Sequence, residues 1–184
     1  MKLNYQVTII IFIVFVTVIF PSSNSQFFVN DKIDNKVSIS FLNEEIEIKS
    51  KSGYVYITED KNSTIDEGKP ELPKYSFNYG VKPAKEYSLS FSVKSSHTLE
   101  DINIYPYQEP KNKEKSNNEL VMLYDDIFYP ESNIVKARAS MRGNDLLMID
   151  IIPFSYSFNS KDLVVFDEIE IIIQETGDRA VTSS

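Results

Sequence analysis

The sequence predicts an all-β fold, an antiparallel β-sandwich with little or no helix in the mature part of the chain. Three observations support this. Apolar residues recur at every second position in many short runs, which is the period of a strand with one buried face. No window of about a dozen residues carries the apolar spacing of an amphipathic helix. Polar clusters and Pro or Gly residues separate the runs at short intervals, as in two packed sheets.

The clearest alternation lies in residues 37–41 and 87–93, where Val, Ile, Leu, Tyr and Phe alternate with serine. Both runs predict strands with one apolar face. Weaker alternation predicts five further strands, at residues 45–49, 54–58, 75–79, 101–105 and 134–138.

The block at residues 146–174 contains two runs rich in Val, Ile, Phe and Tyr, and the polar cluster 159–162 lies between them. This pattern predicts a hairpin. Residues 59–73 are polar and contain Gly68 and two prolines, so we expect a long connection there. Residues 111–119 include no apolar side chain and predict a solvated loop.

The first 25 residues have the pattern of a secretory signal peptide: Lys2, an apolar run at 7–20, then Pro21 and small residues. The apolar run is shorter than the roughly twenty residues that span a bilayer, so we expect no stable membrane insertion after cleavage. We place cleavage after Ser25. Residues 26–184 then form a single domain with a flexible tail at 176–184, and we expect it to be secreted, periplasmic or extracellular.

Composition excludes several kinds of chemistry. The chain has no cysteine, which removes disulfides, thiolate metal sites and a cysteine nucleophile. Its net charge of −8 repels phosphate backbones, so we expect no nucleic-acid partner. The single histidine, His97, follows two serines in what we interpret as an exposed turn, and we expect it to be uncommitted. We therefore expect no metal and no cofactor.

The acidic residues favour a structural interpretation over glycoside hydrolysis. Glu45 and Glu47 flank one isoleucine and Glu168 and Glu170 flank another, which predicts solvent-facing carboxylates on strands. We expect no enzyme activity. The 11 Tyr and 12 Phe residues should mostly lie in the core, although exposed tyrosines leave glycan binding open.

A set of short motifs occurs in a recognisable order along the chain. A Gly-x-Pro-x-Leu-Pro motif comes first, followed by a strand-like run ending in Pro, an aromatic-Pro step, an Arg-Gly pair and the closing block; the residues are Gly68, Pro70, Leu72, Pro73, Pro106, Pro130, Arg142, Gly143 and Pro153. In this order the motifs resemble the propeptide domain of gingipain-type cysteine peptidases. The resemblance extends from Gly68 to about residue 175.

The resemblance implies a β-sandwich that packs on a cysteine peptidase catalytic domain, assists its folding or secretion, and inhibits it with a basic side chain that mimics substrate. In the family the inhibitory loop follows the strand that ends in Pro, which here is Pro106. The candidate inhibitory residues are therefore Lys111, Lys113 and Lys115, with Lys113 the first choice by its spacing. A solvated charge run is the alternative interpretation.

The chain differs from the family pattern in ways that affect the expected partner. The candidate side chains are lysines, which make a point contact with a carboxylate where arginine makes a two-pronged one, so a lysine-preferring peptidase fits better. No peptidase sequence follows Ser184, so we expect action in trans or from a longer precursor. Arg179 is a candidate processing site, with an ordinary tail as the alternative. A free-standing secreted module that binds a glycan or a surface protein is the competing hypothesis.

Overall fold

The computed structural model describes residues 25–33, 35–43, 46–57, 62–110, 120–123 and 127–178. These residues form antiparallel sheets without helix, which confirms the all-β prediction. No helix in this part of the chain has the length and apolar character needed to cross a membrane. The strands are β1 (Ser25–Ile33), β2 (Lys36–Asn43), β3 (Ile48–Lys51), β4 (Tyr54–Ile57), β5 (Tyr75–Gly80), β6 (Lys85–Leu99), β7 (Phe128–Tyr129), β8 (Ile134–Met141), β9 (Asn144–Ile151), β10 (Phe154–Ser157) and β11 (Leu163–Asp178).

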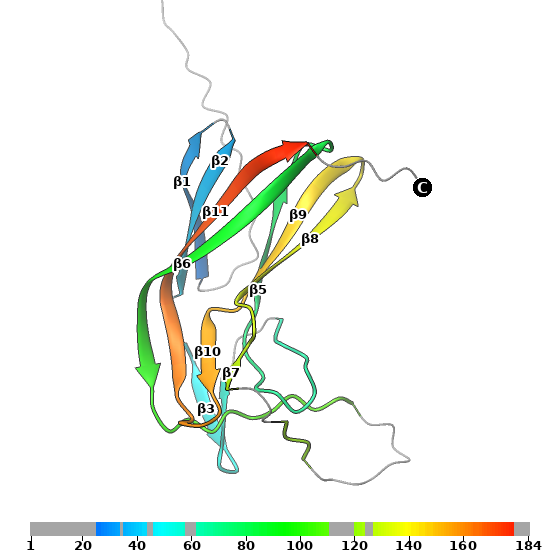
Figure 1. Ribbon diagram of the computed structural model, residues 1–184. Helices are drawn as coiled ribbons and strands as arrows, with labels where there is room; N and C mark the ends of the chain where they lie inside the picture. The colour runs from blue at the N-terminus through cyan, green and yellow to red at the C-terminus, as the bar shows by residue number, and fades with distance from the viewer. Residues whose placement is uncertain are drawn as a thin grey trace, which may run out of the picture.

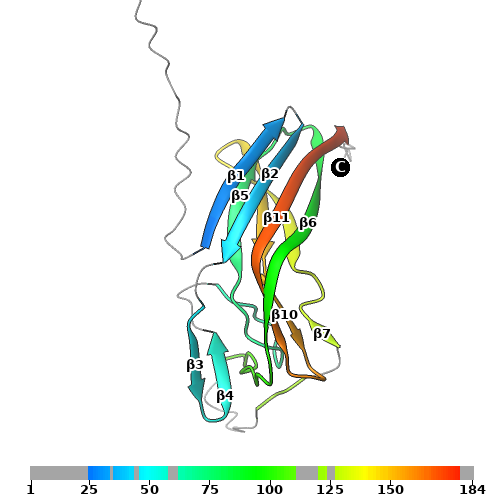
Figure 2. The same ribbon diagram turned by 90° about the vertical axis from the view of Figure 1, so that its left-hand side faces the viewer.

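Two sheets face each other in the upper half of the molecule (Figures 1 and 2). The larger sheet has the order β1-β2-β11-β10-β7, and β6 also pairs with β11 along nearly its whole length. The smaller sheet has the order β5-β9-β8. A separate β3-β4 hairpin lies at the lower end.

The core forms because strand register places apolar residues opposite one another. In the larger sheet Phe41 pairs with Ile169 and Ile39 with Ile171, and all four are buried. The ring of Phe41 also lies 5.0 Å from that of Tyr75 on β5, which joins the two sheets. Burial of such side chains from both sheets is the main source of stability in this fold.

Charged side chains close the open side of the sandwich between β6 and β8. The Arg138 guanidinium donates to the Lys85 and Lys82 carbonyls, each at 2.8 Å, and contacts the Asp145 carboxylate at 3.1 Å. The Lys136 ammonium donates to the Tyr87 carbonyl. These bonds join β8 to carbonyls of β6 and of the turn before it.

The β3-β4 and β8-β9 hairpins use two-residue turns with positive φ. Ser52 and Gly53 connect β3 to β4 with φ of 56° and 84°, and Arg142 and Gly143 connect β8 to β9 with φ of 52° and 81°. Positive φ at both positions is the type I′ geometry that suits twisted hairpins. The motif residues Arg142 and Gly143 are therefore explained by a turn at the end of the smaller sheet.

The closing block differs from the prediction in one respect. The hairpin at residues 159–162 is confirmed, since β10 pairs with β11 from Phe154 opposite Val165. The first predicted run, however, is not one strand. It divides at Ile152 and Pro153 into β9, which belongs to the smaller sheet, and β10, which belongs to the larger one. Proline removes a backbone donor, and the Asn133 amide bonds to the Ile152 and Phe154 carbonyls at this crossing.

Other sequence predictions need correction. Residues 101–105 form no strand, because Ile104 makes only an isolated bridge to Val55. The strand predicted at 45–49 begins at Ile48. β1 was not predicted, since its sequence does not alternate. β11 continues to Asp178, into the stretch expected to be a tail, and residues 179–184 lie outside the described part.

Candidate functional site

The Gly68–Pro73 segment is irregular and is held by hydrogen bonds from a buried threonine. The Thr64 hydroxyl donates to the Pro70 carbonyl at 2.9 Å and accepts from the Leu72 backbone N–H at 3.0 Å. Leu72 and Pro70 are fully buried beneath this network. A segment without strand neighbours on both sides needs such side-chain partners for its backbone groups.

This motif holds the described chain on both sides of the segment predicted to be the inhibitory loop. On the outgoing side, the Gly68 N–H donates to the Tyr107 carbonyl at 2.8 Å and the Tyr107 N–H donates to the Lys69 carbonyl at 2.8 Å. On the returning side, the Leu123 N–H donates to the Gly68 carbonyl at 3.0 Å. We call residues 68–72, 105–108 and 121–123 together the loop base.

Glycine is required at position 68 for two reasons. Its φ is +75°, a conformation that side chains disfavour. A Cβ at this position would also lie 3.0 Å from the backbone nitrogen of Leu123 and 3.2 Å from a methyl group of Val121. The returning chain approaches so closely that only glycine leaves room for it.

Gln108 links the two sides of the loop base directly. Its amide nitrogen donates to the Val121 carbonyl at 2.8 Å and to the Tyr107 carbonyl at 3.0 Å. Its amide oxygen accepts from the Val121 N–H at 3.0 Å. One side chain thus satisfies both backbone groups of the residue on the opposite side, as a neighbouring strand would.

Tyr129 contacts the chain just before the loop base, and the β3-β4 hairpin contacts the loop base itself. The phenol of Tyr129, which precedes a cis bond to Pro130, donates to the Asp66 carboxylate at 2.7 Å. Burial of this phenol raises the pKa of Tyr129 well above its ordinary value. On the hairpin side, the ring of Tyr56 stacks on that of Tyr105 at 4.8 Å.

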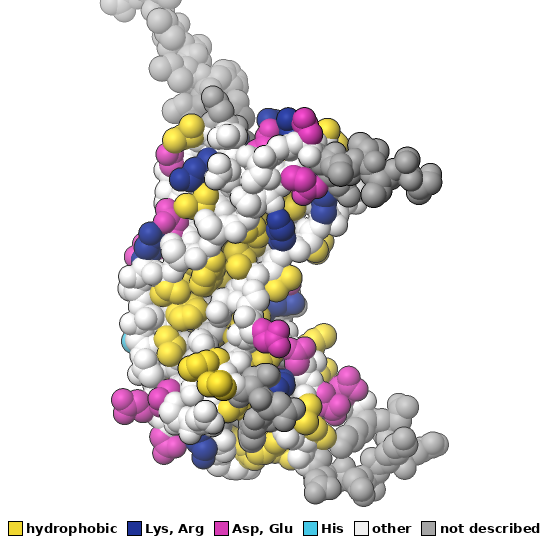
Figure 3. Space-filling model, in the orientation of Figure 1, with side chains coloured by type: hydrophobic (Ala, Val, Ile, Leu, Met, Phe, Trp, Pro, Cys, Tyr) yellow, Lys and Arg dark blue, Asp and Glu magenta, His cyan; other side chains and the backbone are white. Residues whose placement is uncertain are grey.

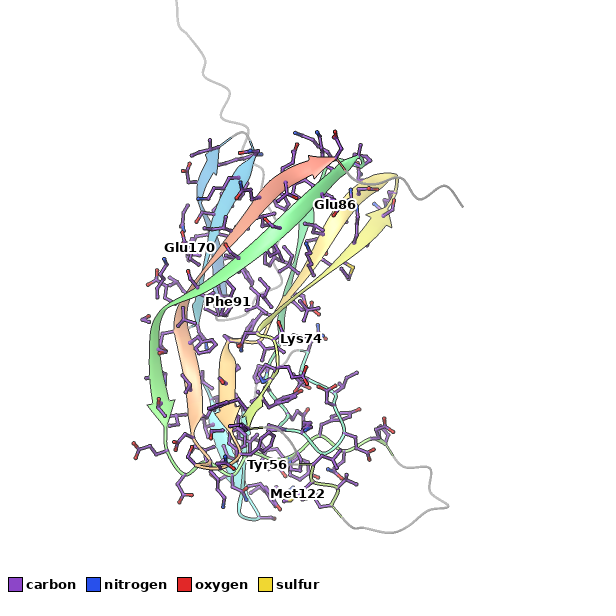
Figure 4. The ribbon with its side chains drawn as sticks, viewed as in Figure 1. Tyr56, Lys74, Glu86, Phe91, Met122 and Glu170 are labelled. Carbon is purple, nitrogen blue, oxygen red and sulfur yellow. The ribbon has the colours of Figure 1, made fainter. Side chains whose placement is uncertain are left out.

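The hairpin also reaches the returning side of the loop base. The Tyr54 hydroxyl lies 3.9 Å from the sulfur of Met122, and Figure 4 shows Tyr56 and Met122 near each other at the lower end of the molecule. Tyr54 and Tyr56 of the hairpin therefore pack against Tyr105 and Met122 of the loop base. This arrangement gives no particular support to the glycan-binding alternative.

A pocket of about 460 Å³ lies next to the loop base. It opens between the connection at 63–74, the turn after Tyr129 and β9. Its lining combines charged groups, including an ion pair of 3.1 Å between Lys74 and Asp150, with the exposed apolar side chains of Ile65 and Val135. Figure 3 shows that the molecule is hollowed on one side, and Figure 4, in the same orientation, labels Lys74 on that side.

The predicted site residues fall into two groups. Gly68, Pro70, Leu72, Pro73 and Pro106 come together in or beside the loop base, where Pro70 and Pro106 form a bridge. Pro130 lines the pocket next to the loop base. Arg142 and Gly143 form the turn between β8 and β9, and Pro153 lies where the chain crosses from the smaller sheet to the larger one. The candidate inhibitory residues Lys111, Lys113 and Lys115, and the candidate processing residue Arg179, lie outside the described residues.

The prediction for His97 was wrong in its structural part. His97 lies within β6 and not in a turn, and its Nδ1 is 2.7 Å from an Asp167 carboxylate oxygen, so it is not uncommitted. The Glu168 and Glu170 prediction is confirmed, because Ile169 between them is fully buried. Glu45 lies outside the described residues. Within the described ranges no cluster of three or more His, Asp or Glu side chains is arranged to hold a metal.

Comparison with known proteins agrees with this architecture. The chain resembles the pro-domain in a complex of Porphyromonas gingivalis RgpB pro- and mature domains, with 18% identity and a TM-score of 0.62 over 86% of this chain and 89% of that one. It also resembles a structure that addresses the zymogenic latency of gingipain K from Porphyromonas gingivalis, with 19% identity and a TM-score of 0.64 over 86% of this chain and 95% of that one. No curated protein matches the sequence.

A sequence model of the Propeptide_C25 family matches residues 22–183, nearly the whole chain. The motif order, the two-sheet architecture and this match agree with one another. The chain belongs to the Propeptide_C25 family, the propeptide domains of gingipain-type cysteine peptidases.

Proposed function

We propose that this protein is a non-catalytic inhibitor of a C25 cysteine peptidase and that it acts by presenting a lysine of the 111–119 segment to the specificity pocket. The observation that carries the proposal is the loop base. Tyr107, which precedes that segment, and Leu123, which follows it, are both bonded to Gly68, so the scaffold fixes the chain on both sides of the segment. Inhibition by substrate mimicry requires such a fixed presentation.

The charge of the segment suits an acidic specificity pocket. Lys111, Lys113 and Lys115 follow Gln108 closely, so each lies within reach of the fixed end. An ammonium placed in a desolvated acidic pocket gains charge-assisted hydrogen bonds that it lacks in water. A peptidase that prefers lysine is therefore the expected partner, encountered in trans or as part of a longer precursor.

The hollowed side of the molecule supplies a second contact region. Ile65 and Val135 are mostly exposed there, beside the pocket next to the loop base. Exposed apolar side chains around a polar pocket are typical of protein-binding surfaces. We infer that the catalytic domain contacts this side when the loop enters its cleft, and that export through the N-terminal signal brings the protein to its partner outside the cytoplasm.

Inhibition assays with a lysine-specific C25 peptidase test the proposal. The purified protein should inhibit it, and Lys113→Ala should weaken inhibition by roughly 5–150-fold, the range of about 1–3 kcal/mol for a buried interfacial cation. Lys32→Ala, an exposed lysine on β1, is the matched control and should leave inhibition unchanged. Full inhibition by the triple alanine variant of Lys111, Lys113 and Lys115 would refute the lysine mechanism.

A further inference from the structure

The two sides of the loop base are joined by bonds of different kinds. The bonds from Gly68 to Tyr107 and from Leu123 to Gly68 are made by backbone atoms, so they depend on chain geometry. The bonds from Gln108 to Val121 are made by a side chain and run straight from one side to the other. They can be removed by one substitution without altering the backbone contacts of the motif.

The Gln108 contact is also the one nearest to the candidate inhibitory residues. Lys113 lies five positions after Gln108 along the chain, which spans at most about 17 Å when fully extended. Whatever fixes Gln108 therefore limits where the lysine ammonium can be placed. The bonds that it makes to Val121 hold the outgoing chain against the returning chain at this point.

We propose that Gln108 is a positioning residue that distinguishes an inhibitory loop from a substrate loop. A segment that enters a protease cleft is cleaved when its backbone can relax into the geometry of attack. A bidentate contact across the base opposes that relaxation, because opening the base breaks both hydrogen bonds to Val121. Gln108 thereby lowers the rate at which the segment is hydrolysed, and it keeps the two sides together.

The first test needs no partner peptidase. Trypsin, which cleaves after lysine, should cut the 111–119 segment of Gln108→Ala about tenfold faster than that of the unaltered protein. Gln108→Glu should also be cut faster, but less so than Gln108→Ala, since a carboxylate still accepts from the Val121 N–H but cannot donate to the Val121 and Tyr107 carbonyls. Gln174→Ala, an exposed glutamine on β11, should be cut at the unaltered rate.

A local measurement separates loss of this contact from loss of folding. Amide hydrogen exchange at Val121 should become about tenfold faster in Gln108→Ala, which removes the acceptor of the Val121 N–H, whereas exchange at Ile149 in the core should not change. Equal exchange at Val121 in all variants, or equal trypsin cleavage, would overturn the inference whether or not the protein inhibits a peptidase.

The second test rests on the proposed function. Against a lysine-specific C25 peptidase, Gln108→Ala should inhibit at first and then lose inhibition with time as the segment is cleaved, while the unaltered protein inhibits stably. Gln108→Ala that inhibits as stably as the unaltered protein would overturn the positioning role. If the unaltered protein does not inhibit at all but Val121 exchange is still faster in Gln108→Ala, the proposed function is wrong. The hydrogen bonds between Gln108 and Val121 are then still supported.

Discussion

Compared with the two-sheet sandwich, the loop base also buries apolar side chains such as Leu72 but depends more on hydrogen bonds to backbone atoms. The sandwich is held by side chains such as Phe41 and Ile169, which are fully buried and pack across the two sheets. The loop base is held by Thr64, Gln108 and a glycine at a close approach. Packing tolerates any side chain of the right volume, whereas the base depends on particular atoms at particular positions.

This difference predicts the largest loss of stability in the sandwich. Phe41→Ala should lower the free energy of unfolding by about 3–5 kcal/mol, because it leaves a cavity between Phe27 and Tyr75. Urea unfolding followed by circular dichroism measures it. Phe28→Ala, whose ring is 42% exposed on β1, is the control and should cost less than about 1 kcal/mol. Equal losses for the two variants would contradict the described core.

The loop base should respond to geometry more than to volume. Gly68→Ala should cost about 2–4 kcal/mol, since it adds the strain of a positive φ to a Cβ contact with the Leu123 backbone. Gly53→Ala isolates the first effect, because Gly53 also has positive φ but a Cβ there meets nothing within 4 Å. It should cost about 1–2 kcal/mol. If Gly68→Ala and Gly53→Ala unfold at the same urea concentration, the close approach of the Leu123 backbone to position 68 adds nothing to the cost of a side chain there.

The same contrast explains which features the sequence predicts. Alternation marks β2 and β6 because each buries one face, so a local pattern reflects the long-range packing. β1 lacks that pattern, and a bulge after Val29 shifts its register against β2. The closing block divides at Pro153 because β9 pairs in the smaller sheet and β10 pairs in the larger one. A local sequence pattern does not indicate such long-range pairing.

The loop base is partly predictable for a related reason. The Gly68 and Pro70 motif is visible as a local cluster of unusual residues, and its order with later motifs indicates the family. Gln108 gives no such signal, because a glutamine in a polar loop is ordinary and its partner Val121 lies 13 residues away. Residues 101–105 misled the prediction, because they alternate like a strand although Ile104 makes only an isolated bridge to Val55.

A smaller effect tests the support of the base by Tyr129. Tyr129→Phe removes the bond to Asp66 and should cost about 1 kcal/mol at pH 7. Since the folded-state pKa of Tyr129 is raised, its contribution is complete below the unfolded value of about 10 and is lost as pH rises through the folded value. The unaltered protein should therefore lose more stability above pH 10 than Tyr129→Phe does, as measured by urea unfolding across that range. Parallel pH profiles for the two proteins would contradict a buried phenol.

The smallest effect is expected on the outer face of the sandwich, where neither packing nor close geometry is at stake. The Lys94 ammonium, 2.7 Å away, and the Ser38 hydroxyl hold the pKa of Glu170 below its ordinary value. A lowered carboxyl pKa contributes stability above the unfolded value of about 4.3, and that contribution is lost as pH falls through the folded value.

Glu170→Gln should therefore lower the midpoint of thermal unfolding slightly at pH 7 and not at all near pH 3. The change should be smaller than for Gly53→Ala, because both partners of the ion pair are solvated and salt screens them. Thermal melts at low and high salt measure it. A Glu170 effect as large as that of Gly68→Ala would mean that surface charge, and not packing or close approach, stabilises this strand, and the contrast between sandwich and loop base would no longer describe the molecule.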